Sequence, residues 1–346
     1  MPTYPISDHC DGQRFFNPHT RPRPLSDVVT WLRTRQKQRW PEQVPLSPYP
    51  LPGPVAAGEI SVSFIGHSTF LIRTVNTALI TDPVFTRHVG PFGRLGPRRV
   101  RAPGLAPSVL PAVDLVLVSH NHYDHLQPSS LRLFADRASY VTPLGVAAQL
   151  GLPAQAGSHT SSHARPTPGV TRKIAELDWW QSTTVGAAAV TCVPAQHFSA
   201  RTPFDRDKTL WCGYLVSVDG VTIYFAGDSG YSPHFAEIAA RCPPIDVALL
   251  PIGAYEPRWF MGPVHMNPDE AVRAHVDVRA RISIGMHFGT FQLTDEGIDE
   301  PVRALERARE RHRVSADAFR VLDFGESLVV EPERNAQEHG ETRRLF

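Results

Sequence analysis

The stretch LVLVSHNHYDHLQPSS, residues 115–130, places three histidines and an aspartate directly behind a run of leucine and valine. The apolar run predicts a buried strand, and the polar residues begin where that strand ends. His120 and His122 are two positions apart, so they point to the same side of an extended backbone. Asp124 and His125 follow where the chain turns away. This loop therefore offers two imidazoles to one metal ion, and a carboxylate with an imidazole to a neighbouring one.

Three later strands end on residues of the same kind. His197 ends AVTCVPAQH, Asp228 ends TIYFAGD, and His287 ends RISIGMH. Asp228 follows Gly227, which lets backbone approach closely, and its two oxygens can bridge two cations. All these donors are nitrogen or oxygen, which favours zinc, with iron or manganese as alternatives. Burying such groups unpaired would cost roughly 2–7 kcal/mol each, so the set predicts a metal site rather than a structural cluster.

The order of strands and helices predicts an α/β fold. Two β-rich regions, each followed by helices, are typical of a four-layer αββα sandwich with two packed sheets between outer helices. A Ser/Pro/Gly/His-rich stretch interrupts the pattern and predicts a mobile insert. We expect an irregular segment with one helix at 1–58, packed on a main domain at 59–331 that carries the insert at 154–173, and a polar tail at 332–346.

Several local signals mark where helices and turns begin. Serine and asparagine side chains cap helices by accepting backbone N–H groups of the first turn. Asp219 and Gly220 predict a tight hairpin between two strands. The expected helices are 25–40 with Ser26 as cap, 233–241 with Ser232 as cap, 268–278 with Asn267 as cap, and 300–312.

Composition narrows the classes of protein. The formal net charge is +1, so nothing favours nucleic acid as a partner. No apolar run approaches the ~18 residues that span a bilayer, and the start MPTYPISDHC lacks the pattern of a secretory signal. The scattered cysteines argue against a disulfide framework. We expect a cytoplasmic protein, with peripheral contact at the inner membrane face as an option and a homodimer as an open question.

These motifs together resemble the metallo-β-lactamase fold hydrolases. The HxHxDH string with His197, Asp228 and His287 is common to that superfamily. SHNHYDHL, PAQHFSART, FAGDSGYSPHFAEI, GAYEPRWFM and ELDWW are similar to the branch of N-acylphosphatidylethanolamine-hydrolysing phospholipases D. The resemblance implies two zinc ions, one held by His120, His122 and His197, the other by Asp124, His125 and His287, with Asp228 between them. It also implies hydrolysis to phosphatidic acid and an N-acylethanolamine.

From these assignments we expect a hydroxide that bridges two metals to attack phosphorus, with Asp124 orienting the nucleophile. His265, just before a predicted helix N-terminus, is the candidate for phosphate contact or proton donation. The alternative for His265 is a capping or supporting role. Tyr123, Arg258 and Trp259 are candidates for substrate contact, and packing is their alternative.

Other residues are expected to play supporting parts. Asp82 is expected to orient a ligand histidine or bond to a loop, and His67 to be structural or to support the ligands. His159 and His163 are expected to be solvated. The alternative function is hydrolysis of a soluble substrate, such as a phosphorylated lactone or another phosphodiester, nucleic acid included. A lipid substrate would favour apolar residues around the site, for which VVTWLRTRQKQRW and RWFM are candidates.

Overall fold

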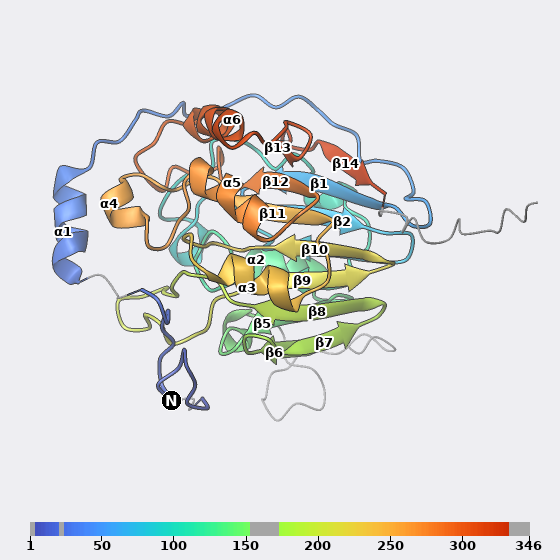
Figure 1. Ribbon diagram of the computed structural model, residues 1–346, viewed down its shortest axis with the longest axis horizontal. Helices are drawn as coiled ribbons and strands as arrows, with labels where there is room; N and C mark the ends of the chain where they lie inside the picture. The colour runs from blue at the N-terminus through green and yellow to red at the C-terminus, as the bar shows by residue number, and fades with distance from the viewer. Residues whose placement is uncertain (1–3, 21–23, 153–172, 332–346) are drawn as a thin grey trace, which may run out of the picture.

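The structure is a computed structural model that describes residues 4–20, 24–152 and 173–331 (Figure 1). Almost all of the predicted insert, with its His159 and His163, lies outside the described residues, as does the predicted tail.

Two mixed sheets of seven strands form the centre of the described chain. In the first sheet the strands from β3 to β6 are parallel, and those from β14 to β3 are antiparallel. Its strands, in spatial order, are β14 (Ser327–Val330), β1 (Ile60–Gly66), β2 (Thr69–Arg73), β3 (Ala78–Thr81), β4 (Leu115–Leu117), β5 (Ser139–Pro143) and β6 (Ile174–Leu177).

The second sheet joins a parallel half to an antiparallel half. Because β9 runs opposite to both of its neighbours, β8, β10 and β12 point the same way, and their carboxyl ends meet at one edge. Its strands, in spatial order, are β13 (Phe319–Arg320), β12 (Ile282–Met286), β11 (Val247–Pro251), β10 (Val221–Phe225), β9 (Gly213–Val218), β8 (Ala188–Val193) and β7 (Ser182–Val185).

Helices cover the outer faces of the two sheets (Figure 1). On the second sheet, α5 packs against β11, and α3 and α6 pack against α5. On the first sheet, the short α2 contributes Leu131 to a cluster with Val116 and Tyr140. The predicted four-layer sandwich is thereby confirmed. The helices are α1 (Leu25–Thr34), α2 (Pro128–Leu131), α3 (His234–Arg241), α4 (Arg258–Met261), α5 (Pro268–Asp277) and α6 (Glu300–His312).

The largest core lies between the sheets, where Phe64, Leu117, Ile223 and Phe225 are fully buried. Burying a side chain of this size stabilises the fold by roughly 1.5–3 kcal/mol. The serines that alternate with apolar residues in β1 are buried too, so that alternation does not mark a solvent-facing side.

Some predicted caps are wrong and others are confirmed. Asn267 accepts a hydrogen bond from the backbone of Glu270 and starts α5 in a complete capping box. Pro24, not Ser26, precedes α1, and no side chain caps it. The residue before α3 is Pro233, and no side chain caps this helix, so the predicted cap Ser232 is wrong as well. The Ser232 hydroxyl lies 2.5 Å from the Nδ1 atom of His234 instead of bonding to the helix backbone. The hairpin at residues 219–220 is confirmed, with positive φ at both positions.

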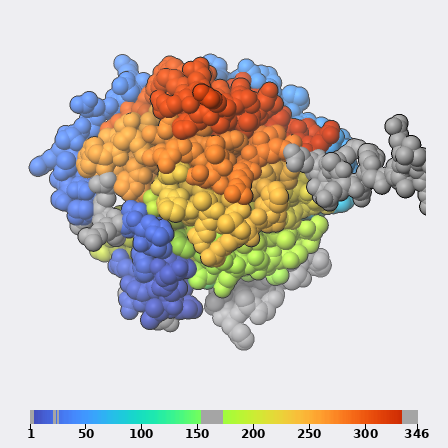
Figure 2. Space-filling view, in the orientation of Figure 1, coloured from blue at the N-terminus to red at the C-terminus, as the bar shows by residue number. Residues whose placement is uncertain are grey.

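The N-terminal segment, residues 4–58, runs along the sandwich and includes α1, which stands beside α4 in Figure 1. Phe15 is buried, and its backbone N–H donates to the carbonyl of Asp207. Figure 2 shows the first residues, in dark blue, lying against the body of the molecule. Among the described residues, none of the helices is long and apolar enough to cross a bilayer.

Candidate metal centre

Loops from both sheets bring the predicted ligands to one end of the sandwich. The first sheet supplies the loop after β4, and the second supplies the loops after β8, β10 and β12. All seven predicted ligands lie within this cluster, and five of them, with His67, His265 and Asp82, are buried. His67 joins from the turn between β1 and β2. The structure therefore brings together side chains that are up to 220 positions apart from His67 to His287.

Three histidines form the first group. The Nδ1 atom of His122 is 2.9 Å from Nε2 of His120 and 3.1 Å from Nε2 of His197. These are the three residues that the sequence assigns to one metal ion, and their nitrogens could serve one cation together.

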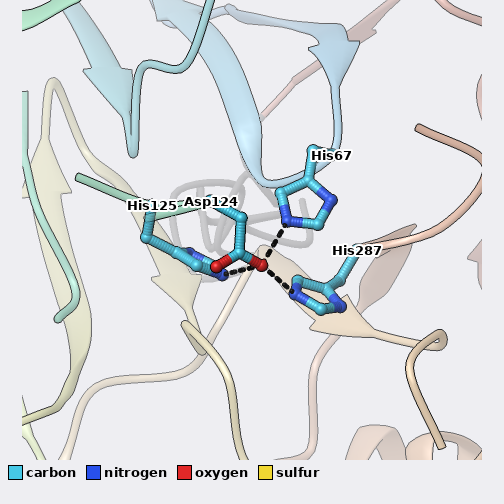
Figure 3. Close-up of side chains that lie close together, drawn as sticks. All are labelled: His67, Asp124, His125 and His287. Carbon is cyan, nitrogen blue, oxygen red and sulfur yellow. Dashed lines mark hydrogen bonds and ion pairs between the residues drawn. The ribbon is translucent and has the colours of Figure 1, made fainter. Parts of the chain in front are cut away.

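The carboxylate of Asp124 organises the second group (Figure 3). Its Oδ2 atom lies 3.1 Å from Nε2 of His67, 3.4 Å from Nε2 of His287 and 3.5 Å from Nε2 of His125. His67 was not expected among the ligands. Its position in a turn directly behind the strand ISVSFIG was the available signal, because the other predicted ligands also follow strands.

Asp228 lies between the two groups. Its Oδ2 atom is 3.0 Å from Nε2 of His287 and 3.1 Å from Nε2 of His125. The same atom is 3.8 Å from Nε2 of His197 and 4.0 Å from Nε2 of His120. Among the described residues, Asp228 is the only carboxylate within 4.0 Å of histidine nitrogens of both groups.

Contacts on the far side of the rings fix how the histidines face. The Nδ1–H group of His125 donates to Asp82 at 2.6 Å, as predicted for a residue that orients a ligand. Asp82 also accepts a hydrogen bond from the hydroxyl of Ser119. The hydroxyl oxygen of Ser119 can then accept a hydrogen bond from Nδ1 of His120. His197 donates from Nδ1 to the carbonyl of Val264. In each ring the Nε2 atom is therefore turned toward the centre.

Charge is concentrated in the second group. Burial lowers the pKa of His125, but Asp228 and Asp124 raise it, and the outcome is well above its usual range. Burial likewise lowers the pKa of His287, and the same carboxylates raise it to about 9. For Asp124 and Asp228, burial raises the pKa, but the histidines lower it well below its usual range. Two imidazolium ions thus balance two carboxylates.

The first group is neutral. Burial and His197 lower the pKa of His122 to about 3. Burial lowers the pKa of His197 to about 4, although Asp228 raises it. Burial and neighbouring histidines hold the pKa of His120 well below its usual range. These three rings therefore present lone pairs rather than positive charge.

The residues fit a pair of divalent cations. Lone pairs of the first group face one another at distances near 3 Å, which only a shared cation or proton would stabilise. Within the described chain, Oδ1 of Asp228 and Nδ1 of His287 are buried without a hydrogen-bond partner. Such orphaned groups are costly unless a cation or partner satisfies them. Two cations would also replace the protons of the second group.

A cavity of about 380 Å³ opens on this cluster. The cluster forms its polar floor, with His122, Asp124, His197, Asp228 and His265 exposed to it. The walls are largely apolar and come from two sources. The sandwich and its loops supply Phe198, Trp211, Phe260, Met261, Val264 and Leu293, and the N-terminal segment supplies Phe16, Asn17, Thr20, Val28 and Trp31.

Of the residues predicted to contact the substrate, only His265 lines the cavity in the described structure. His265 lines the cavity, and its Nδ1 atom is 4.0 Å from Asp228 with no hydrogen-bond partner. Arg258 and Trp259 do not line it: the Arg258 guanidinium is held by Glu270 at 2.7 Å. Tyr123 also lies outside the lining, under the guanidinium of Arg201.

Only part of the N-terminal wall was expected from the sequence. Val28 and Trp31 belong to VVTWLRTRQKQRW, a predicted candidate for apolar residues around the site, whereas Phe16, Asn17 and Thr20 were missed. Asn17 donates to the carbonyl of His197 at 2.7 Å, and its side-chain oxygen accepts from Trp211. Trp31 stacks on Phe260 with ring centroids 4.9 Å apart. No periodicity or spacing links Asn17 to His197 or to Trp211, so the sequence carries no signal for the contacts of Asn17.

Known proteins are similar to this chain in sequence and in fold. A family model described as the beta-lactamase superfamily domain matches residues 77–288. The chain is 39% identical over 280 residues to an uncharacterised protein of Mycobacterium tuberculosis, covering 78% of this chain and 71% of that protein. It is 35% identical over 277 residues to N-acyl-phosphatidylethanolamine-hydrolyzing phospholipase D 1 of Caenorhabditis elegans, covering 76% and 74%. A metallo hydrolase of Ignicoccus hospitalis has the same fold, with a TM-score of 0.55 at 20% identity, covering 79% and 99%.

Proposed function

The chain belongs to the metallo-β-lactamase superfamily of metal-dependent hydrolases, and from that premise we propose that it is a dinuclear zinc phosphodiesterase. Its proposed substrates are phospholipids of the N-acylphosphatidylethanolamine kind, and its products phosphatidic acid and an N-acylethanolamine. The similarity to the nematode phospholipase D over 76% of the chain supports this substrate class.

The observation that carries the proposal is the cavity with a polar floor and apolar walls. A phospholipid has the same division, because its phosphodiester is charged and its chains are apolar. A soluble phosphodiester would need no wall of Trp31, Phe260 and Leu293 over the metal ligands. Matching apolar walls to acyl chains removes both from water, at roughly 25 cal/mol per Å² of apolar surface.

We assign His120, His122 and His197 to one ion, Asp124, His125 and His287 to the other, and Asp228 to both. Bound zinc would supply Lewis acidity toward the phosphoryl oxygens and would activate a water molecule. The oxygen of water bonds to phosphorus, and the bond from phosphorus to the ethanolamine oxygen breaks.

His265 is assigned to proton transfer: its neutral ring would take up the proton that the attacking water gives up and would pass it to the leaving oxygen. Its ring lines the cavity on the floor side, and burial holds its pKa well below the usual range. In the described structure its Nδ1 atom is free to meet a substrate atom. Arg206 also lines the cavity, above the ring of Phe198, and we assign it, in place of Arg258, to contact with the phosphate.

The test is mass spectrometry of products from zinc-loaded protein in ¹⁸O-labelled water. N-acylphosphatidylethanolamine, phosphatidylcholine and a phosphorylated lactone are offered separately. We expect cleavage of the first, with the label in phosphatidic acid because water attacks phosphorus. Hydrolysis of the lactone alone, or label in the N-acylethanolamine, would contradict the proposal.

A matched pair of histidine variants sharpens this test. His265→Gln should lower turnover by about 10²–10⁴-fold, the usual contribution of a positioned acid or base. His275→Gln changes a buried histidine on α5 whose Nδ1 atom lies 2.8 Å from the hydroxyl of Ser283 on β12, away from the cluster. It should leave turnover unchanged per folded molecule. Equal losses of turnover in both variants would mean that His265 takes no part in proton transfer.

A further inference from the structure

We propose that the loop of residues 87–98 docks the protein on the surface of an anionic phospholipid bilayer, next to the opening of the cavity. The proposal rests on the proposed function, since it explains how the site would reach a lipid. The stretches that form α1 and α4 were the candidates that the sequence offered for this contact. The proposal assigns the membrane contact to a different surface.

The tip of this loop carries two apolar side chains, Phe92 and Leu95, that are exposed to solvent. Phe92 is 93% exposed and Leu95 is 60% exposed, three positions apart on the same loop. Phe92 also has a φ of 60°. That conformation costs a bulky residue about 1–3 kcal/mol and persists only where the surroundings impose it. Single exposed apolar residues are common, but two at one tip, one of them with a strained backbone, are a defined feature.

The neck of the loop holds the tip in place. The N–H of Val89 donates to the carbonyl of Pro97, and the N–H of Arg99 to that of Arg87. One step closer to the tip, a Cβ on Gly90 would meet the carbonyl oxygen of Leu95 at 2.4 Å. The backbone is so closely packed there that only glycine fits. The loop is therefore a built projection whose tip has little freedom to fold back.

The charge of the region matches an anionic surface. Residues 83–113 contain five arginines and not one aspartate or glutamate. Arg87, Arg94 and Arg98 are exposed and form no ion pair with the described residues. Each basic side chain near an anionic bilayer contributes about 1 kcal/mol, and the attraction falls off within a Debye length. An apolar tip flanked by such arginines has the composition of an interfacial anchor.

The base of the loop lies beside the site. Val89 packs in a small cluster with Phe291, Tyr123 and Leu293, and Leu293 lines the cavity. The backbone at Gly93 approaches the side chain of Gln127, which in turn donates to the carbonyl of Tyr123 in the ligand loop. A bilayer touched by the tip would thus face the opening through which a lipid reaches the floor.

The test is flotation of the metal-loaded full chain with vesicles, compared between pure phosphatidylcholine and equal parts of phosphatidylcholine and phosphatidylglycerol. Neither lipid is the proposed substrate, so binding is measured apart from hydrolysis. We expect binding to the mixed vesicles that weakens with added salt. The variant Phe92→Ser/Leu95→Ser should bind about tenfold or more weakly, because two side chains no longer enter the bilayer. Arg87→Gln/Arg94→Gln should lose the preference for phosphatidylglycerol.

A control removes equally exposed apolar side chains elsewhere. Leu133→Ser/Val276→Ser, at residues 56% and 54% exposed, should bind as the parent does. All variants should hydrolyse a soluble phosphodiester at the parent rate, since none of these residues lies at the site. Equal binding by parent and loop variants would overturn the proposal, as would a loop variant that changes only the oligomeric state in size-exclusion chromatography. Vesicle binding without cleavage of N-acylphosphatidylethanolamine would instead refute the proposed function and leave the docking surface standing.

Discussion

The floor and the N-terminal wall of the cavity are built in different ways. Each floor ligand follows a strand, and several are oriented by a second contact, such as that of Asp82 to His125 or of the Val264 carbonyl to His197. The wall depends on a segment with little regular structure. Its only described helix, α1, leaves Val29 and Leu32 about half exposed.

This difference in construction suggests that the floor determines the reaction and that the wall determines which substrates enter. A rigid floor can keep two cations in place whatever lies above it, because its ligands are set by the sandwich. A wall held by the stack of Trp31 on Phe260 and by the hydrogen bonds of Asn17 can change its shape at low cost. Floor substitutions should therefore damage every reaction of the site, and wall substitutions should damage only the use of lipids.

The largest effect is expected from Asp228→Asn. An amide replaces the carboxylate that lies within 4.0 Å of histidines of both groups, so neither of the two proposed cations would keep its bridging negative charge. Metal content measured by mass spectrometry should fall by at least one ion per chain. Turnover of lipid and of soluble phosphodiester should both fall by about a thousandfold or more. Retention of two metals with near-normal turnover would refute the bridging role of Asp228.

Asp82→Asn should give the next largest effect. Asp82 does not face the cavity, but it is fully buried and accepts hydrogen bonds from His125 and Ser119. Losing such a supporting carboxylate typically weakens metal affinity by about 10–100-fold, and titration with a zinc-chelating dye measures this. Asp246→Asn is the matched control, because Asp246 accepts from Thr222 at the far end of β10. Equal zinc affinity in both variants would mean that Asp82 is only structural.

Trp31→Ala tests the wall. The change removes the ring that stacks on Phe260 and opens one side of the cavity. We expect kcat/KM for the lipid to fall by up to about tenfold through KM, since an aromatic pair of this kind contributes about 0.5–1.5 kcal/mol. Metal content and turnover of a soluble phosphodiester should not change. Leu32→Ala, on the exposed face of the same helix, is the control, and a loss on both substrates would erase the distinction between wall and floor.

The same distinction explains what the sequence could predict. The ligands follow strands whose apolar patterns are local, so HxHxDH and the three later strand ends led to the cluster and to the fold. The wall depends on contacts such as Asn17 with His197, which no local pattern encodes. Arg258 was expected near the substrate because it adjoins Trp259, but the ion pair with Glu270 turns it to the start of α5. His67 was expected to be structural or to support the ligands, and its contact with Asp124 agrees with a supporting role.

The smallest expected effect concerns how the wall segment is anchored. His9 lies between Asp178 at 2.7 Å and Asp8 at 2.6 Å, and its ring stacks on Trp179. Burial lowers the pKa of His9, but the hydrogen bonds to Asp178 and Asp8 raise it above its usual value.

A histidine with a raised pKa in the folded state stabilises the fold below the pKa of the unfolded chain. That stabilisation disappears as the pH rises through the folded value. The parent should therefore be more stable than His9→Gln, and the difference in their free energies of unfolding should depend on pH. We expect this difference to be larger at about pH 6 than at about pH 9, by about 0.5–1 kcal/mol. Chemical denaturation at the two pH values measures this. A difference that does not depend on pH would mean that packing on Trp179, rather than the ion pair, anchors the segment.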